Sequence, residues 1–263
     1  MICAGIDAGS RAIKIVLVDA ETLETVGSAA ADQGVEQDAL VTGLYDKLLA
    51  DCRLDRRDVA GVVATGYSRN AVSLADTTIT EITCHACGVH HVAPDAATVI
   101  EIGGQDSKLL RLNPNGSVRD FAMNDRCAAG TGRFLEMVAA RLGVGLEALG
   151  ELAARSARPA AISSMCVVFA ETEIIGLLAA HARPEDIVAG VQAAIVKRVV
   201  AMAGRKLASP VVFTGGVALI PGMDRALESA IGQPVAIAPN PQMTGALGAA
   251  ILAARQPRTT FPD

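Results

Sequence analysis

The chain has 263 residues, of which 51% are hydrophobic, and a formal net charge of −5 at pH 7. This length suits one large domain or two modest domains with an ample core. Aromatic residues make up 3% of the chain and tryptophan is absent, so few side chains could stack on the bases of a single strand. Because the net charge is also negative, we expect no nucleic-acid partner.

The cysteines and the apolar segments favour a cytoplasmic protein. The six cysteines lack the spacing of a secreted disulfide scaffold, and Met1 leads into a strand pattern rather than a signal peptide. No apolar run reaches the roughly 18 residues needed to span a bilayer, because charges such as Glu171 and Lys197 interrupt the best candidates. We therefore expect no membrane partner.

The first part of the chain predicts an α/β lobe. β-Branched runs at Ile2–Asp7 and Ile13–Asp19, joined by a glycine turn, indicate a hairpin. Helical spacing at Leu40–Leu49 is followed by a buried strand at Val59–Thr65 and the start of a short helix at Ala71–Leu74.

The second part repeats this opening. Ala97–Ile102 and Ser107–Leu112 predict another strand–turn–strand unit, again with an acidic residue near the end of its first strand. The repeat indicates a duplicated α/β architecture with lobes at 1–94 and 95–263. The last helix, which is rich in alanine, can pack back on the first lobe. Helices are expected at Gly132–Leu142, Leu146–Ala154, Val168–Ala180, Pro184–Leu207 and around Gly245 and Gly248, and a strand at Pro210–Thr214.

Three glycine turns follow predicted strand ends. They are Asp7-Ala8-Gly9-Ser10, Gly103-Gly104-Gln105-Asp106 and Thr214-Gly215-Gly216-Val217. Each turn by itself is compatible with a tight connection that needs positive φ. Together they predict a nucleotide between two lobes, because such turns present N–H groups to phosphates and their carboxylates can hold Mg²⁺ or orient a water. The sequence contains neither the Walker nor the Rossmann glycine pattern.

Two cysteines precede predicted helices. Cys127 stands before the glycine-rich start of one helix, and Cys166 follows two serines before another. A helix N-terminus carries roughly +0.5 charge, which stabilises a thiolate or a bound anion. Either cysteine alone is more typical of a small buried hydrophobe. The pair favours a metal or redox role as strongly as it favours that simpler interpretation.

A third group, Cys84-His85-Ala86-Cys87 with His90 and His91, has spacing that zinc or a redox motif could use. We favour a helix that begins after Glu81. A cluster held within one chain by Cys84, Cys87, Cys127 and Cys166 remains an alternative.

Motifs spread over nearly the whole chain resemble the ATP-dependent activators of 2-hydroxyacyl-CoA dehydratases, in a superfamily that includes the ATPase subunits of benzoyl-CoA reductase. The motifs are Asp7-x-Gly-Ser, Ala64-Thr-Gly-Tyr-Ser-Arg-Asn70, Glu101-Ile-Gly-Gly-Gln-Asp106, Asn124-Asp-Arg-Cys-Ala-Ala-Gly-Thr-Gly-Arg-Phe-Leu135, Ser163-Ser-Met-Cys166, Phe169-Ala-Glu171 and Thr214-Gly-Gly-Val-Ala218.

The resemblance implies the actin, sugar kinase and Hsp70 type of ATPase fold, with two lobes and a nucleotide cleft. It implies ATP/ADP and Mg²⁺, and a homodimer that holds one [4Fe–4S] cluster through Cys127 and Cys166 of each subunit. It assigns catalytic roles to Asp7, Gln105 and Asp106. The residues it places at the nucleotide are Gly9, Ser10, Arg11, Lys14, Gly103, Gly104, Gln105, Gly130, Gly132, Gly215, Gly216 and Val217.

The implied activity is ATP hydrolysis coupled to transfer of one electron, received from ferredoxin or flavodoxin, to a separate dehydratase or reductase component in an anaerobic metabolism. Two positions depart from the family pattern. Glu101 stands where aspartate is more usual, and Arg126 replaces the more usual lysine. The alternatives are an ATPase subunit of a benzoyl-CoA reductase, a small-molecule kinase of the same fold and an actin-like assembly module.

Overall fold

The computed structural model describes residues 1–164, 166–204 and 207–256, which form two compact units. The first unit comprises Met1–Pro94, Pro114–Val118 and the described residues from Met243 onward, and the second comprises Asp95–Asn113 and Arg119–Gln242. From the sequence we expected lobes at 1–94 and 95–263 with a last helix that can pack back on the first lobe; in the structure the chain returns to the first unit at Met243.

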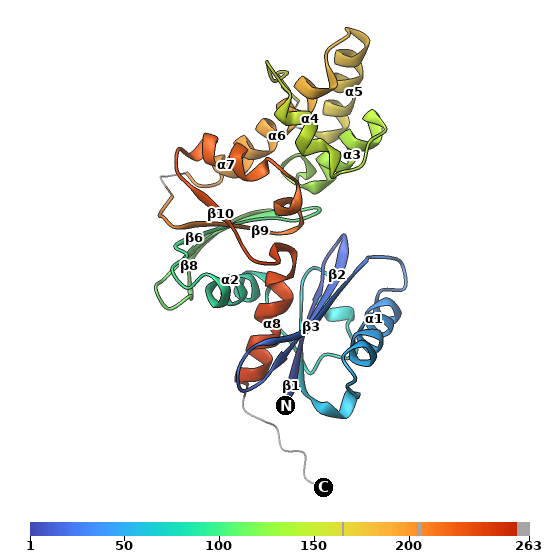
Figure 1. Ribbon diagram of the computed structural model, residues 1–263, viewed down its shortest axis with the longest axis vertical. Helices are drawn as coiled ribbons and strands as arrows, with labels where there is room; N and C mark the ends of the chain where they lie inside the picture. The colour runs from blue at the N-terminus through green and yellow to red at the C-terminus, as the bar shows by residue number, and fades with distance from the viewer. Residues whose placement is uncertain (165, 205–206, 257–263) are drawn as a thin grey trace. The chain divides into compact units, whose positions relative to one another are not determined.

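The first unit contains a five-stranded sheet in the order β3-β2-β1-β4-β5 (Figure 1). Strands β1, β2 and β3 pair antiparallel, and β1, β4 and β5 pair parallel. Successive side chains of a strand point to opposite faces. Accordingly, Ile2, Ala4 and Ile6 pack in a cluster with α1, whereas Cys3 packs in a cluster with α8. The elements are β1 Ile2–Ala8, β2 Ala12–Asp19, β3 Thr25–Asp32, α1 Gln37–Asp51, β4 Val59–Thr65, β5 Thr77–Thr78, α2 Glu81–Val92 and α8 Thr244–Arg255.

Helices α2 and α8 lie against each other in the first unit (Figure 1). A Cβ atom at Gly248 would overlap the Cys84 carbonyl, and one at Gly88 would overlap the Thr244 carbonyl. These glycines permit the two helix backbones to touch, which is the close packing expected of the alanine-rich last helix.

The second unit contains a sheet in the order β10-β9-β6-β7-β8. This order matches that of the first sheet when β6 to β10 are set against β1 to β5, so the predicted duplication of an α/β architecture is confirmed. The elements are β6 Thr98–Ile102, β7 Ser107–Leu112, β8 Val118–Asn124, α3 Gly132–Leu142, α4 Ala148–Ala154, α5 Val167–Ala179, α6 Pro184–Ala201, β9 Val211–Thr214, α7 Met223–Ile231 and β10 Val235–Ile237. Short 3₁₀ turns occur at η1 Arg56–Asp58, η2 Arg69–Ala71, η3 Ala128–Gly130, η4 Gly216–Leu219 and η5 Pro241–Met243.

Two predicted helices differ from the structure. The helix expected from Ala71 is absent, since only the single turn η2 forms there and the Ser73 N–H donates to the Asp38 carboxylate at 2.8 Å instead of continuing a helix. The helix expected at Pro184–Leu207 ends at Ala201, and residues 205–206 of that prediction lie outside the described residues. Within the described ranges, no helix combines the length and apolarity that crossing a bilayer requires.

Candidate functional site

The first unit has a buried carboxylate at the end of its central strand. Asp7 on β1 is 5% exposed and lies opposite Lys14 on β2, whose Nζ donates to Asp7 Oδ2 at 2.9 Å. On the other side Asp7 is in register with Thr65 of β4. The next residue, Gly66, has φ +89°, and a Cβ there would overlap Asp7 Oδ1. A side chain at Gly66 would therefore displace the carboxylate.

The second unit repeats this arrangement. Glu101 on β6 is 4% exposed and lies opposite Lys108 on β7, whose Nζ donates to Glu101 Oε2 at 2.9 Å. Glu101 is also in register with Thr214 of β9. Gly215 follows with φ +89°, and a Cβ there would lie 2.6 Å from Glu101 Oε1. Lys108 also donates to Asp106 Oδ2 at 2.6 Å, so one buried ammonium holds two carboxylates.

The arrangements around Asp7 and around Glu101 thus contain the same four residues: an acid, a lysine, a threonine and a glycine with positive φ. Lys108 was not among the residues predicted from the sequence. The sequence nevertheless contains a spacing that could have indicated it, because each lysine follows its acid by seven residues, from Asp7 to Lys14 and from Glu101 to Lys108. The longer side chain of Glu101 still reaches its lysine, so the departure from aspartate leaves the ion pair intact.

Three glycine-containing segments meet in the second unit. A Cβ at Gly132 would lie 3.2 Å from the Gly103 oxygen, 3.3 Å from Val217 Cγ2 and 3.4 Å from Gly104 Cα. The first two N–H groups of α3 are tied to the same turn, since Gly132 N donates to Gly103 O at 2.9 Å and Arg133 N donates to Gly104 O at 2.9 Å. The β6–β7 turn, the start of α3 and the start of η4 therefore form one packed surface.

Among the other predicted nucleotide residues, Gly130 is buried in η3, whereas those of the β1–β2 turn and Gln105 are partly or fully exposed. Gly9, Ser10 and Arg11 form the half-buried connection between β1 and β2, and Arg11 pairs with Asp32 at 2.9 Å. Gln105 is exposed at the β6–β7 turn. Parts of both turns therefore lie at the surface of their unit.

Cys127 lies in a loop fixed by Asn124. The Asn124 amide donates to the Cys127 carbonyl at 2.7 Å, and its oxygen accepts from the Cys127 N–H at 3.1 Å. Cys127 caps the short turn η3, whereas α3 begins at Gly132. The sequence placed Cys127 at the start of that helix. The first N–H groups of α3 are instead used by the β6–β7 turn, so they do not face the thiol.

Cys166 is exposed and is the N-cap residue of α5, as the sequence indicated. Its preceding loop is held by Glu173, which accepts hydrogen bonds from the Ser163 N–H at 2.9 Å, the Ser163 hydroxyl at 2.8 Å and the Ser164 N–H at 2.9 Å. Burial raises the pKa of the Glu173 carboxyl, but these hydrogen bonds outweigh that effect and lower its pKa to about 2. The loop is therefore anchored by a carboxylate that is ionised at neutral pH. Met165, within this motif, lies outside the described residues.

Arg198 on α6 contacts both cysteine loops. Its Nη2 donates to the Ser164 carbonyl at 2.8 Å, two residues before Cys166. Its Cβ lies 3.7 Å from the position that a Cβ at Gly130 would take, three residues after Cys127. The structure thus brings the two predicted ligand loops to one helix.

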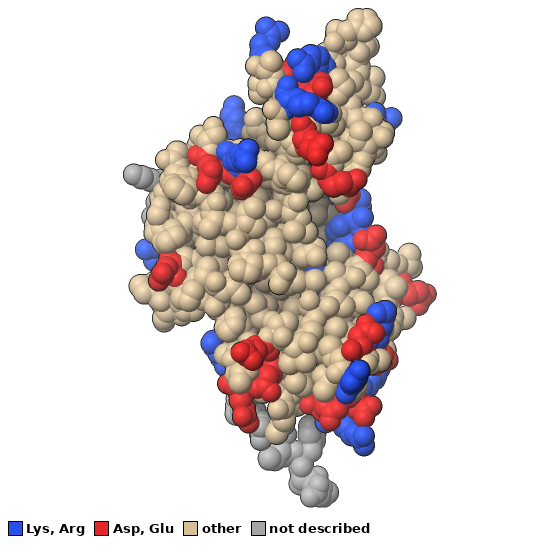
Figure 2. Space-filling view, in the orientation of Figure 1, with Lys and Arg blue, Asp and Glu red and all other residues tan. Residues whose placement is uncertain are grey.

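The helix after Cys166 has an apolar face that no described residue covers. Val168, Phe169 and Ile175 are 66%, 70% and 47% exposed. In Figure 2 the surface over the far end of α5, at the top of the view, carries no charged side chain. Large apolar side chains exposed together on one helix are typical of an interface.

The Cys84 and Cys87 pair belongs to the α2–α8 contact. Cys84 is fully buried, and burial raises the pKa of its thiol to about 12. Among the described residues, no group of three or more His, Cys, Asp or Glu side chains is arranged to hold a metal ion. The second unit thus offers Cys127 and Cys166 as the accessible thiols for a ligand.

Comparison with known proteins gives the family. The model of the BadF/BadG/BcrA/BcrD ATPase family matches residues 4–253. The chain belongs to this family. A 2-hydroxyisocaproyl-CoA dehydratase activator from Clostridioides difficile is 42% identical over 258 residues, which cover 96% of this chain and 95% of that protein. A benzoyl-CoA reductase subunit from Thauera aromatica is 32% identical, with 95% of this chain and 92% of that protein covered.

Solved structures agree with this result. The structure of the Clostridium difficile 2-hydroxyisocaproyl-CoA dehydratase activator with bound ADPNP has a TM-score of 0.90 at 41% identity, with 97% of this chain and 94% of that chain covered. Component A of the Acidaminococcus fermentans (R)-2-hydroxyglutaryl-CoA dehydratase has a TM-score of 0.91 at 39% identity, with 97% and 98% covered. The ROK hexokinase from Thermus thermophilus, at 15% identity and a TM-score of 0.50, shares the fold alone. The predicted actin and sugar kinase type of ATPase fold is thereby confirmed.

Proposed function

We propose that this member of an ATPase family is an ATP-hydrolysing activator that delivers a low-potential electron to a 2-hydroxyacyl-CoA dehydratase component. The observation that carries the proposal is the connection in the second unit between the glycine turn at Gly103–Asp106 and the loops of Cys127 and Cys166. The names of the relatives support the same function, since the family members at 41–43% identity are dehydratase activators.

The glycine turns, each described within its own unit, are the segments that this proposal assigns to the nucleotide. The β1–β2 turn at Gly9 and Ser10 and the β6–β7 turn at Gly103 and Gly104 present backbone to the phosphates, with Gly215 and Gly216 nearer the nucleoside. Lys14 supplies a positive charge beside Asp7. The ADPNP in the related Clostridium difficile activator supports this ligand class.

The carboxylates at these turns fit Mg²⁺, which prefers oxygen ligands. Asp7 and Asp106 each accept a hydrogen bond from a lysine at one oxygen, which orients the carboxylate. Gln105, exposed beside Asp106, is placed to orient an attacking water. In this proposal no phosphoryl group passes to a second substrate.

The thiols of Cys127 and Cys166 fit a [4Fe–4S] cluster, which is held by four thiolates and supplies one-electron chemistry when bound. The second unit of one chain contains two cysteines, Cys127 and Cys166, so four ligands of this kind would come from two chains. The exposed apolar residues Val168 and Phe169 beside Cys166 support a homodimer contact at this position. The N-terminal charge of α5 favours an anionic group at Cys166.

The proposal requires ATP hydrolysis to be coupled to electron transfer. The hydrogen bonds from Gly132 and Arg133 to the β6–β7 turn give a physical route for that coupling. A change in that turn between ATP and ADP would shift the start of α3 and, through η3, the Cys127 loop. Delivering an electron at low potential requires free energy from ATP hydrolysis, because the reduction potential of a one-electron couple changes by about 59 mV per 1.4 kcal/mol. Ferredoxin or flavodoxin would supply the electron.

The 32% identity to the benzoyl-CoA reductase subunit of Thauera aromatica favours a second candidate, an ATPase subunit that acts with a paralogous chain. The two candidates differ in assembly. A chain that dimerises alone and binds the cluster alone favours the activator, whereas dependence on a second polypeptide favours the reductase subunit.

The deciding experiment is iron and acid-labile sulfide per chain in protein purified without oxygen, with native mass on the same sample. We expect about two irons per chain in a dimer. Cys166→Ser should lose the iron and keep nucleotide binding. Cys84→Ser is the matched control, because Cys84 lies in the α2–α8 contact and should leave the iron unchanged. A colourless, iron-free wild-type protein after reconstitution would refute the proposal.

A further inference from the structure

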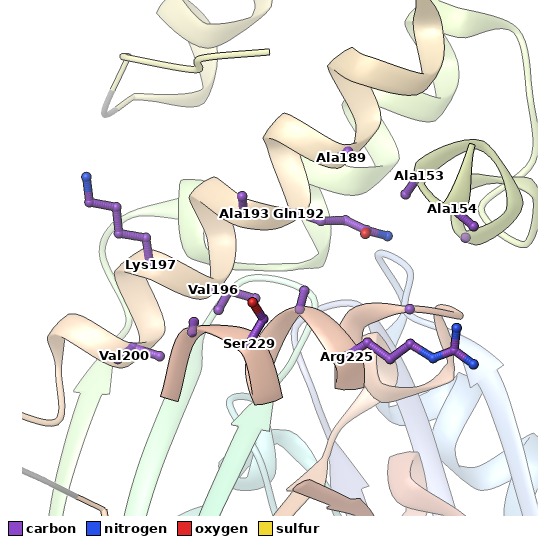
Figure 3. A pocket seen from close by; sticks show the side chains of 14 residues that line it. Ala153, Ala154, Ala189, Gln192, Ala193, Val196, Lys197, Val200, Arg225 and Ser229 are labelled. Carbon is purple, nitrogen blue, oxygen red and sulfur yellow. The ribbon is translucent and has the colours of Figure 1, made fainter. Parts of the chain in front are cut away.

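A cavity lies in the second unit between α4, α6 and α7 (Figure 3). Its volume is about 500 Å³, within the range of small-molecule sites. None of the described residues that line it belongs to the glycine turns or to the Cys127 and Cys166 loops. The cavity is therefore separate from the site described above.

One face of α6 and one face of α7 form the apolar walls. Positions 189, 192, 193, 196, 197 and 200 of α6 recur at helical spacing and line the cavity together. Small side chains on three helices leave the space open. The apolar residues of the wall are Ala153, Ala154, Ala189, Ala193, Val196, Val200, Ala226 and Ala230.

Gln192 is the buried polar group of this cavity. Its side chain is 4% exposed, and its Nε2 has no hydrogen-bond partner among the described residues. In Figure 3 the amide extends from α6 into the space between α4 and α7. A buried donor without an acceptor is costly, so this N–H group is suited to a ligand oxygen.

The remaining polar groups of the lining are also donors or cations. Lys197 on α6 and Arg225 and Ser229 on α7 line the cavity, and no Asp or Glu is among its described lining residues. Gln192 and Arg225 extend toward the same side of the view, whereas Lys197 extends from α6 away from α7 (Figure 3), and both Arg225 and Lys197 are exposed. The N-terminus of α7, whose N-cap Gly222 provides no side-chain cap, also faces this space. A ligand here must accept hydrogen bonds and carry negative charge at one end, with an apolar body against the alanines.

We propose that this cavity binds a short-chain aliphatic carboxylate, with the Gln192 amide donating to a carboxylate oxygen and Arg225 balancing its charge. The alkyl chain lies along Ala193, Val196 and Ala226. The proposal is independent of the ATPase and electron-transfer function, and its test uses binding alone.

The test is calorimetric titration of the intact chain with butanoate, butanamide and butylammonium, which share a carbon chain and differ in charge. We expect one saturable butanoate site, at least about tenfold tighter than either analogue. Gln192→Leu and Arg225→Gln should each weaken butanoate about tenfold, because each removes a charge-assisted contact. Ala193→Phe should abolish binding by filling the space from an exposed position of α6.

Gln37→Leu and Arg119→Gln are the matched controls, since these residues lie outside the cavity, and both should bind butanoate as the wild type does. Should Gln192→Leu fail to fold, Arg225→Gln and Ala193→Phe still decide the question. Absence of saturable butanoate binding at millimolar concentrations would overturn the proposal, as would equal binding of butanamide or unchanged affinity in Arg225→Gln and Ala193→Phe.

Discussion

Replacing Lys108 by methionine removes the ammonium that holds two carboxylates in the second unit. The Lys108 side chain is 2% exposed and that of Glu101 is 5% exposed, so water does not replace the lost partner. Removing one member of a buried ion pair typically costs about 3–5 kcal/mol. We therefore expect Lys108→Met to destabilise the second unit by about that amount, a large part of a total stability of about 5–15 kcal/mol.

The equivalent lysine of the first unit provides a control within the same chain. Lys14 is 19% exposed and pairs with Asp7 at 2.9 Å, whereas Lys108 also holds Asp106 at 2.6 Å. Water partly reaches Lys14, and the pairing described for it is with one carboxylate rather than two. Lys14→Met should therefore lower the free energy of unfolding by less than Lys108→Met does, by about 1–3 kcal/mol.

Hydrogen exchange with mass spectrometry separates the two units, which a global unfolding curve does not. Lys108→Met should lower protection in β6 and β7, and Lys14→Met should lower it in β1 and β2. Adding Glu101→Gln to Lys108→Met should recover part of the loss, because the uncompensated charge is then removed. Equal, small effects of the two lysine variants, or no recovery in the double variant, would refute the reasoning.

Three further predictions concern single positions. Gly215→Ala should lower stability by about 1–3 kcal/mol and reduce ATP hydrolysis, because Gly215 has φ +89° and the Ile102 carbonyl occupies the position that a Cβ would take. Gly176→Ala should instead stabilise the protein by about 0.5–1 kcal/mol, because no atom lies within 4 Å of a Cβ placed there. Thermal unfolding measures both changes. In iron-free protein, iodoacetamide at mildly alkaline pH should label the exposed Cys166 well before Cys84, whose pKa is raised to about 12, and peptide mass mapping would show the reverse order if these placements are wrong. The pKa of Glu173 is lowered from 4.5 to about 2, so its stabilisation of the loop is full above 4.5 and is lost as the pH falls toward 2. The protection of the amides of residues 163–164, measured relative to their intrinsic exchange rate at each pH, should fall over that interval, and Glu173→Gln should remove the dependence.

Local pattern was enough to predict several elements. The strand Val59–Thr65 and the helix Gly132–Leu142 have the predicted bounds, because each has a strong apolar period and clear turn residues at its ends. The predicted start of α5 at Cys166 also holds. By contrast, β3 was missed because Thr25–Asp32 is mostly small and polar, and pairing with β2 rather than propensity makes it a strand.

The sequence by itself determined the duplicated strand–turn–strand plan, the three glycine turns and the two cysteines that precede helical segments, since these depend on short spacings along the chain. Only the tertiary structure decided that Lys108 holds Glu101 and Asp106, that α3 donates its first N–H groups to the β6–β7 turn, and that Gln192 faces a cavity. The physical reason is that burial and hydrogen-bond partners depend on which distant segments pack together, and spacing along a chain does not specify them.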